Sequence, residues 1–315
     1  MPNKNVLRHR GQMGQIPIYL GKLFRMFIFV NDWKFLPMAA IIAGLVAKVA
    51  ATNMFKTQEG TIFGSLALAC ICIWNGCFNS IQVVCRERDV VKREHRDGMH
   101  ISSYILAHVI YQGFLCLCQV IITIIVCRFA GLSFPDQGLV FGNFFVDFGI
   151  TLFLITYASD MMALMLSSIV RNTTSAMTVM PFVLIFELLF SESMFELSGF
   201  AQSITNVSVA KWGINALASL ANYNNLPMVS VWNKLKSLSN IDVYGQKPVG
   251  AVIDYLNESG NAYKFTAWMG TYNQNDNYIY SASNLGLCWG ALLAFSLLFI
   301  VLATIALERI DHDKR

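Results

Sequence analysis

Charge is what this sequence has least of. Only 13% of its 315 residues are Asp, Glu, Lys or Arg, whereas 55% are hydrophobic. A soluble domain needs about 25% charged residues to cover its surface. Much of the surface must therefore face something other than water, and we expect an integral membrane protein. The net charge of +4 is spread over several clusters, which gives no indication of a nucleic-acid partner.

Motifs that hold a nucleotide or a metal are also missing. No GxxxxGK[ST] segment occurs, so the sequence offers no loop to cradle the phosphates of ATP. The eight cysteines fall in or beside apolar runs, no two have the CxxC spacing, and none clusters with histidine. We therefore expect them to pack as small side chains in helices, and we expect no cofactor or metal on this chain.

Apolar runs dominate what is present, and six are long enough to cross a bilayer, which takes about 20 residues. They are 35–55, 60–85, 101–129, 143–169, 175–196 and 284–307. Because lipid offers no hydrogen-bond partner to an open backbone, each should be helical. A shorter run, 16–33, is interrupted by Lys22 and Arg25. It suits a helix at the membrane surface, or alternatively an extension of the first span. The predicted fold is an all-α membrane protein with six spans.

Lys and Arg favour one side of this arrangement. With the N-terminus inside, the inner segments hold fifteen of the 23: six in 1–34, five in 86–98, Arg171 and three after Leu307. The positive-inside rule then places both termini in the cytoplasm. The long polar segment before the last span holds too many aromatic residues for a disordered loop, and we expect a small folded cap outside the membrane. The predicted division of the chain is 1–34, 35–196, 197–283 and 284–315.

The densest charge, "RERDVVKREHRDG" (86–98), lies between the second and third spans. Its charges alternate in sign, which permits a helix, and Gly98 is a natural helix stop. The charge begins and ends within a turn of the two spans. We therefore expect a short, stiff helical elbow that joins two membrane helices and transmits a push. A solvated loop is the alternative.

The stretch "RERDVVKREHRDGMHISSYILAHVIYQ" resembles the first intracellular elbow of G-subfamily ABC exporters and of their bacterial relatives, the type-2 ABC permeases. The matching positions are Glu87, Arg88, Arg93, Glu94, Gly98, Ser103, Tyr104, Leu106 and Ala107. A second segment, "SVAKWGINAL" (208–217), is similar to the S-x-x-R/K-W segment of the outer loop before the last span. The fused nucleotide-binding domain and the outer-loop cysteines of eukaryotic members are missing. This favours a bacterial permease whose ATPase is a separate chain.

The resemblance implies a mechanism. Two permease chains, identical or different, face each other in the cell membrane, and two ABC ATPase subunits, which hold ATP and Mg²⁺, dock beneath them. Closure of the ATPases moves the elbow and switches a cavity from inward- to outward-open, exporting an amphipathic, lipid, peptide or glycan-type cargo. The permease itself has no catalytic residues. The residues expected to couple it to the ATPase are Arg86, Glu87, Arg88, Arg93, Glu94 and Gly98.

By the same resemblance, cargo binds between the second and fifth spans. The candidate cavity residues are Asn75, Phe78, Asn79 and Gln82 on one face of the second span, and Leu184, Glu187 and Ser191 on the fifth. Hydrogen bonding between helices explains the first set as well. A carboxylate at mid-bilayer costs about 3 kcal/mol, so Glu187 should meet water, cargo or a partner such as Lys48. Asp160, in the fourth span, we expect to be structural.

Two other functions compete with transport. A membrane-embedded transferase would show clusters of His and Asp at an interface. His95 and His100 flank the elbow, but no HExxH or similar spacing occurs. A channel or a scaffolding subunit is the third alternative.

Overall fold

The structure is a computed structural model that describes residues 11–29, 33, 35–50, 53–193 and 198–309. Over these ranges its ordered elements are helices, with two isolated bridges and no strand. In chain order they are α1 (Gln12–Phe29), α2 (Phe35–Ala50), α3 (Gln58–Ser80), α4 (Val83–Arg86), α5 (Arg88–Arg96), α6 (Ile101–Phe129), α7 (Phe144–Ile169), α8 (Thr173–Leu189), α9 (Phe200–Thr205), α10 (Val209–Leu220), η2 (Tyr223–Asn225), α11 (Ser230–Leu238), α12 (Pro248–Glu258), α13 (Ala262–Tyr272), η3 (Asp276–Tyr278) and α14 (Ala282–Glu308).

Four helical stretches in the described part of the chain are long and apolar enough to cross a membrane. They are α3 with α4, α6, α7 and α14, whereas the apolar parts of α2 and α8 are shorter. The predicted spans 101–129 and 143–169 agree with α6 and α7 to within one residue. The predicted fifth span is too long: α8 ends at Leu189, and Glu192 then has a positive φ of 59°, which breaks the helical path.

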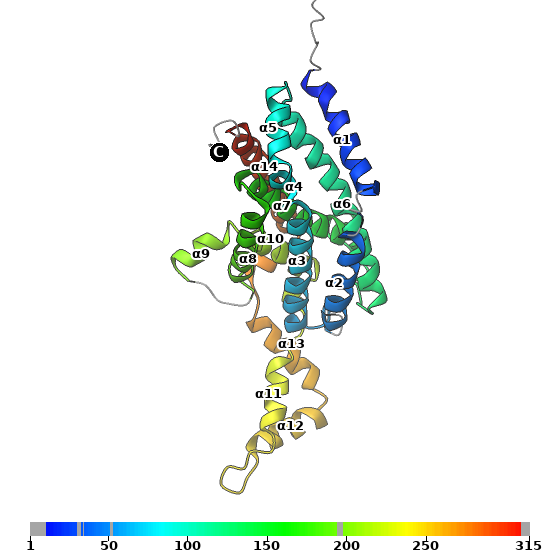
Figure 1. The fold of residues 1–315 in the computed structure, drawn as a ribbon. Coiled ribbons are helices and arrows are strands. Elements are labelled where there is room, and N and C mark those ends of the chain that lie inside the picture. The colour runs from blue at the N-terminus through cyan, green and yellow to red at the C-terminus, as the bar shows by residue number, and fades with distance from the viewer. Residues whose placement is uncertain (1–10, 30–32, 34, 51–52, 194–197, 310–315) are drawn as a thin grey trace, which may run out of the picture.

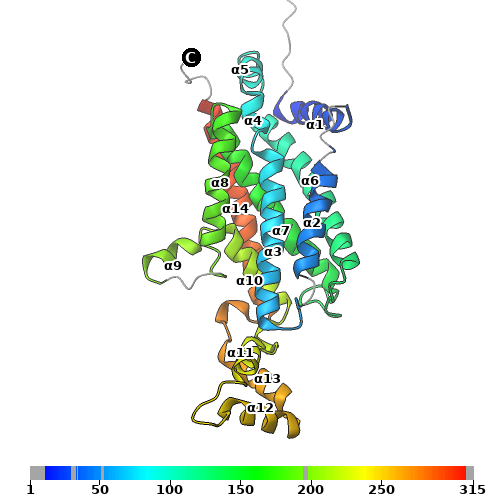
Figure 2. The same ribbon diagram turned by 60° about the horizontal axis from the view of Figure 1, so that its bottom comes forward.

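The second predicted span is divided rather than continuous. It begins at Gln58 as α3, and a turn at Ile81 and Gln82 separates α3 from α4. The first predicted helix, α1, packs along α6 instead of extending α2. Helices α1, α2 and α6 lie together on one side of the bundle (Figure 2).

The core lies where α7 packs against α3 and α14. Gly76 permits the closest approach, because a Cβ there would lie 2.3 Å from the carbonyl oxygen of Thr156. Helix α10 inserts among α3, α7 and α14, and its residues are buried apart from Trp212, which is half-buried. The segment 208–217, expected in an outer loop, is therefore mostly inside the bundle.

The two ends of the bundle differ (Figure 1). At one end lie α5, the start of α1 and the end of α14, and at the other lie α11, α12 and α13. Gln58 and Glu59 tie that far group to α3: Gln58 Nε2 donates to the Gly270 carbonyl at 2.9 Å, and Glu59 Oε1 accepts from the backbone N–H of Val229 at 2.9 Å. Aromatic contacts, including Trp232 with Phe265, hold these helices together.

Candidate coupling elbow and cargo cavity

The elbow is a helix, α5, that ends as its sequence predicts. Gly98 has a φ of 101°, a conformation that glycine adopts without strain. The N–H of Gly98 bonds to the His95 carbonyl at 3.1 Å, and the N–H of Met99 to the Glu94 carbonyl at 2.9 Å. This pair of bonds is a Schellman motif, which closes a helix and turns the chain sharply. After this turn the chain begins α6 at Ile101.

Apolar residues fix the charged elbow to the bundle. Val91 and Met99 are buried in a cluster with Met161 of α7 and Leu307 of α14. Arg88 adds a polar anchor: its Nη1 donates to the carbonyls of Ser168 at 2.9 Å and of Val170 at 3.1 Å, at the C-terminal end of α7. A cation at this position satisfies carbonyls that have no helical partner and complements the helix dipole.

Helix α1 grips the same elbow from the other side, through three residues that we call the α1 clamp: Gln15, Tyr19 and Lys22. Lys22 Nζ forms an ion pair with Glu87 Oε2 at 2.9 Å, and Tyr19 Oη donates to Glu94 Oε2 at 3.0 Å. Burial, together with the hydrogen bond to Glu94 and its charge, raises the pKa of Tyr19, so this phenol remains the proton donor.

Gln15 closes the clamp at the end of the elbow. Its Nε2 donates to the Gly98 carbonyl at 3.1 Å, and its Oε1 accepts from the His100 N–H at 2.9 Å. The sequence analysis did not identify the clamp residues as partners of the elbow. Their spacing of four and three residues along an apolar helix, which places all three on one face, was the available signal.

The six predicted coupling residues therefore occupy four kinds of position. Glu87 and Glu94 bind the α1 clamp, Arg88 binds α7, and Gly98 ends the helix. Arg86 and Arg93 are exposed. Asp89, Arg96 and Asp97 are exposed as well, so the elbow presents a mixed-charge face.

The polar face of the second span meets neighbouring helices. Asn79 and Gln119 of α6 exchange two amide hydrogen bonds of 2.9 Å each. Asp160 of α7 is fully buried and accepts from Asn79 Nδ2 at 3.3 Å, from Ser80 Oγ, and from Cys116 Sγ at 3.2 Å. This cluster joins α3, α6 and α7, which is the structural role expected for Asp160.

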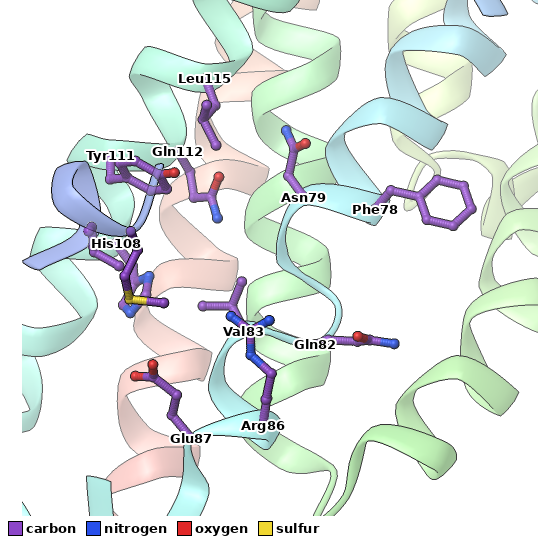
Figure 3. Close-up of a pocket in the computed structure, with 12 residues that line it drawn as sticks. Phe78, Asn79, Gln82, Val83, Arg86, Glu87, His108, Tyr111, Gln112 and Leu115 are labelled. Atoms are coloured by element: carbon purple, nitrogen blue, oxygen red, sulfur yellow. The ribbon is translucent and has the colours of Figure 1, made fainter. Parts of the chain in front are cut away.

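One pocket lies between α1, the α3–α4 break and α6 (Figure 3). Asn79 and Gln82 line it, and so does Phe78. In Figure 3 Phe78 and Gln82 extend away from the α6 side chains, whereas Asn79 turns up between the helices. Asn75 is buried one turn earlier and does not line this pocket.

Two of the three predicted residues of the fifth span, Leu184 and Glu187, line a different pocket between α3 and α8 together with apolar residues such as Trp74, and Ser191 does not line it. Glu187 is 3% exposed, and its Oε2 accepts from Ser208 Oγ and from the Ala210 N–H, each at 2.8 Å. The carboxylate thus caps the N-terminus of α10 and is not joined to Lys48, which is exposed on α2. Within one chain the predicted cavity residues of the second span and those of the fifth span therefore do not line a common pocket. A cavity shared between two chains stays a prediction.

The S-x-x-K-W segment forms the start of α10. Ser208 is its N-cap, and its Oγ accepts from the Lys211 N–H at 3.3 Å. The buried Lys211 ammonium reaches Glu192 Oε2 at 3.1 Å, and Thr205 Oγ1 and Asn206 Oδ1 at 2.9 Å each. A buried ammonium is tolerated when it is paired and hydrogen-bonded in this way.

A family model of ABC-2 type transporters matches residues 23–221, which is more than half of the chain. The chain belongs to the ABC-2 type transporter family. The match runs from α1 through α10 and so contains the elbow, the Asp160 cluster and the Glu187 cap. No curated protein matches the chain.

Membership of the ABC-2 family sets the coarse function. The chain is a transmembrane permease component of an ABC transporter and is not an enzyme by itself. Permeases of this family generally work with an ABC ATPase subunit. Its apolar helices agree with a multi-pass membrane protein. Among the residues that the structure describes, no three His, Cys, Asp or Glu side chains gather as a metal site.

Proposed function

We propose that this ABC-2 permease is an exporter subunit in the cell membrane of a bacterium, energised by a separate ATPase chain that docks on the exposed face of the elbow. The supporting observation is that some charged residues of 86–98 bind the rest of the chain and others are exposed. One side of α5 is held by α1 and α7, whereas Arg93 of α5 and Arg86 at the end of α4 are exposed to an aqueous partner. A polar, charged surface suits a wet docking groove.

The proposed topology has six spans: α2, α3 with α4, α6, α7, α8 and α14. Helices α2 and α8 are shorter than about 20 residues, and a locally thinned bilayer or flanking polar side chains can accommodate such a mismatch. The elbow, the start of α1 and the end of α14 share one end of the bundle, which supports a cytoplasmic location for both termini. Helices α11 to α13 would then lie outside.

The proposed working unit contains two permease chains, in a homodimer or heterodimer surrounded by lipid, and two ATPases that carry ATP and Mg²⁺. Cargo would pass between α3 and α8 of the two chains. Phe78, Gln82 and Leu184 are the candidates with accessible side chains for contacting it. Asn79, Glu187 and Ser191 form hydrogen bonds within their own chain. They would support the cavity wall without contacting the cargo. An amphipathic, lipid, peptide or glycan-type cargo fits such a mixed surface.

The test is reconstitution in lipid vesicles with the ATPase chain that copurifies with the permease. The permease alone should hydrolyse no ATP. We expect Arg93→Glu to weaken ATPase docking about fivefold or more, since reversing one interface charge changes binding by about 1 kcal/mol or more. Lys234→Glu is the matched control, because Lys234 is equally exposed but lies on α11 at the opposite end. Equal affinities for the two variants would contradict the proposed docking face.

A further inference from the structure

The pocket between α1, α4 and α6 contains polar atoms without partners. His108 and Gln112 of α6 line it and are 2% and 1% exposed. Within the described residues, neither His108 Nδ1 nor Gln112 Oε1 has a hydrogen-bond partner. A buried polar atom left in this state costs about 1–3 kcal/mol. Figure 3 shows the two side chains on the α6 wall of the pocket, so a guest that forms hydrogen bonds there would remove the penalty.

The Gln112 amide carries no charge, and the charged residues stand at the rim of the pocket. Glu87 is already paired with Lys22, and Arg86 is exposed to solvent. The amide oxygen of Gln112 can only accept a hydrogen bond, whereas a neutral imidazole nitrogen either donates or accepts. The guest must therefore supply a donor such as a hydroxyl group, and it has no need of a charge.

The remaining wall requires an apolar body behind that hydroxyl. Its apolar part is formed by Leu23, Met26, Phe78, Val83 and Leu115, and the polar residues Asn79, Gln82 and Tyr111 lie among them. His108 and Gln112 follow the start of α6 by seven and eleven residues, which is roughly 10–16 Å along the helix. This depth passes the headgroup layer of a bilayer that α6 crosses. Ile110 and Phe114, on the same stretch of α6, are exposed.

We propose that this pocket binds the hydroxyl head of a neutral amphiphile of the diacylglycerol type, drawn from the surrounding lipid. Its hydroxyl donates to Gln112 Oε1 and lies beside His108, and its chains extend over the apolar wall toward the membrane. The pocket shares Phe78 and Gln82 with the proposed cargo path, but His108 and Gln112 do not belong to that path, and the proposal does not depend on the direction or cargo of transport. Because α1 and α4 both line it, an occupant would contact the helix that holds the elbow, α1, and the helix that leads into it, α4.

The probe is radiolabelled 1,2-dioctanoylglycerol, added to the full chain in phosphatidylcholine nanodiscs, which contain no hydroxyl donor of their own. Its 3-acetyl ester is the control ligand, because it keeps the chains and loses the donor. We expect saturable binding of one molecule per chain, with about a tenfold preference over the ester. Losing one buried hydrogen bond produces a change of that size.

Two variants locate the binding. Gln112→Leu and His108→Phe should each reduce the preference to about twofold or less, and either one is sufficient if the other fails to fold. Phe114→Leu, on the exposed face of α6, should retain the full preference. Equal binding of both ligands by the wild type, or no saturable binding, would mean that the pocket holds only water and would overturn the proposal. A preference that survives in both variants would place the site elsewhere and overturn it too.

Discussion

Arg88 and Arg93 belong to the same short helix and the same sequence motif, yet the structure predicts opposite consequences for their removal. Arg88 donates from Nη1 to the last carbonyls of α7, those of Ser168 and Val170. Arg93 is exposed one and a half turns later. We expect Arg88→Ala to loosen the elbow from the bundle and Arg93→Ala to leave it in place.

The magnitude follows from the bonds lost. A hydrogen bond from a charged group contributes about 1.5–3 kcal/mol, and a cation at a helix C-terminus contributes about 0.3–1 kcal/mol. Both bonds of Arg88 share one nitrogen, and water can replace part of what is lost because the side chain is half-buried. We therefore expect Arg88→Ala to cost about 2 kcal/mol. Arg93→Ala should cost less than about 0.5 kcal/mol, as exposed substitutions usually do.

Thiol labelling of Cys85 measures this local stability. Cys85 is 6% exposed, and its N–H donates to Ser167 Oγ of α7 at 3.2 Å, so labelling requires α4 to separate from α7. A loss of 2 kcal/mol corresponds to labelling about 30-fold faster, which mass spectrometry of the Cys85 peptide can quantify. If the two variants label at the same rate, the anchoring role of Arg88 is refuted.

Two further substitutions test contacts inside the helical bundle. Gly76→Ala should sharply lower the yield of monodisperse protein in size-exclusion chromatography, because its Cβ would lie 2.3 Å from the Thr156 carbonyl oxygen. Gly286→Ala, with no atom within 4 Å of its Cβ, should match wild type, and equal yields for both variants would contradict this contact. Glu187→Ala should lower the free energy of unfolding by about 2–3 kcal/mol, because it removes the acceptor at the start of α10. Glu187→Gln keeps an acceptor oxygen and should recover most of this in a denaturant titration, whereas a loss as large as that of the alanine variant would argue against capping.

Long apolar runs with charged ends gave the most reliable predictions. The bounds of α6 and α7 follow from such runs, and Gly98 ends the elbow for the steric reason that the sequence suggests. The end of α8 was harder to predict, because apolar residues such as Phe190 follow its last helical turn. At that point local turns decide the path, such as the positive φ of Glu192, and hydropathy does not report them.

The hydrogen-bond partners of buried polar groups could not be predicted from the sequence, for a different reason. An Asn or Glu in an apolar helix indicates that a partner must exist, but many residues can fill that role. Glu187 meets Ser208 and Asn79 meets Gln119, pairs separated by 21 and 40 residues. Only the packing of α10 and α6 against their neighbours decides these pairs. The same packing gives the S-x-x-K-W segment a place inside the bundle.

The elbow shows why charge density alone does not identify a docking surface. Glu87, Arg88 and Glu94 bind other elements of their own chain, whereas other charged side chains, including Arg93, are exposed. Loss of an inward residue displaces the helix and so disturbs docking indirectly, whereas loss of an outward residue weakens docking without displacement. Faster labelling of Cys85 should therefore accompany impaired ATPase coupling for Glu94→Ala but not for Arg93→Glu. If both variants labelled at the wild-type rate while losing coupling, both faces of the elbow would belong to the ATPase interface, and the α1 clamp would not hold it.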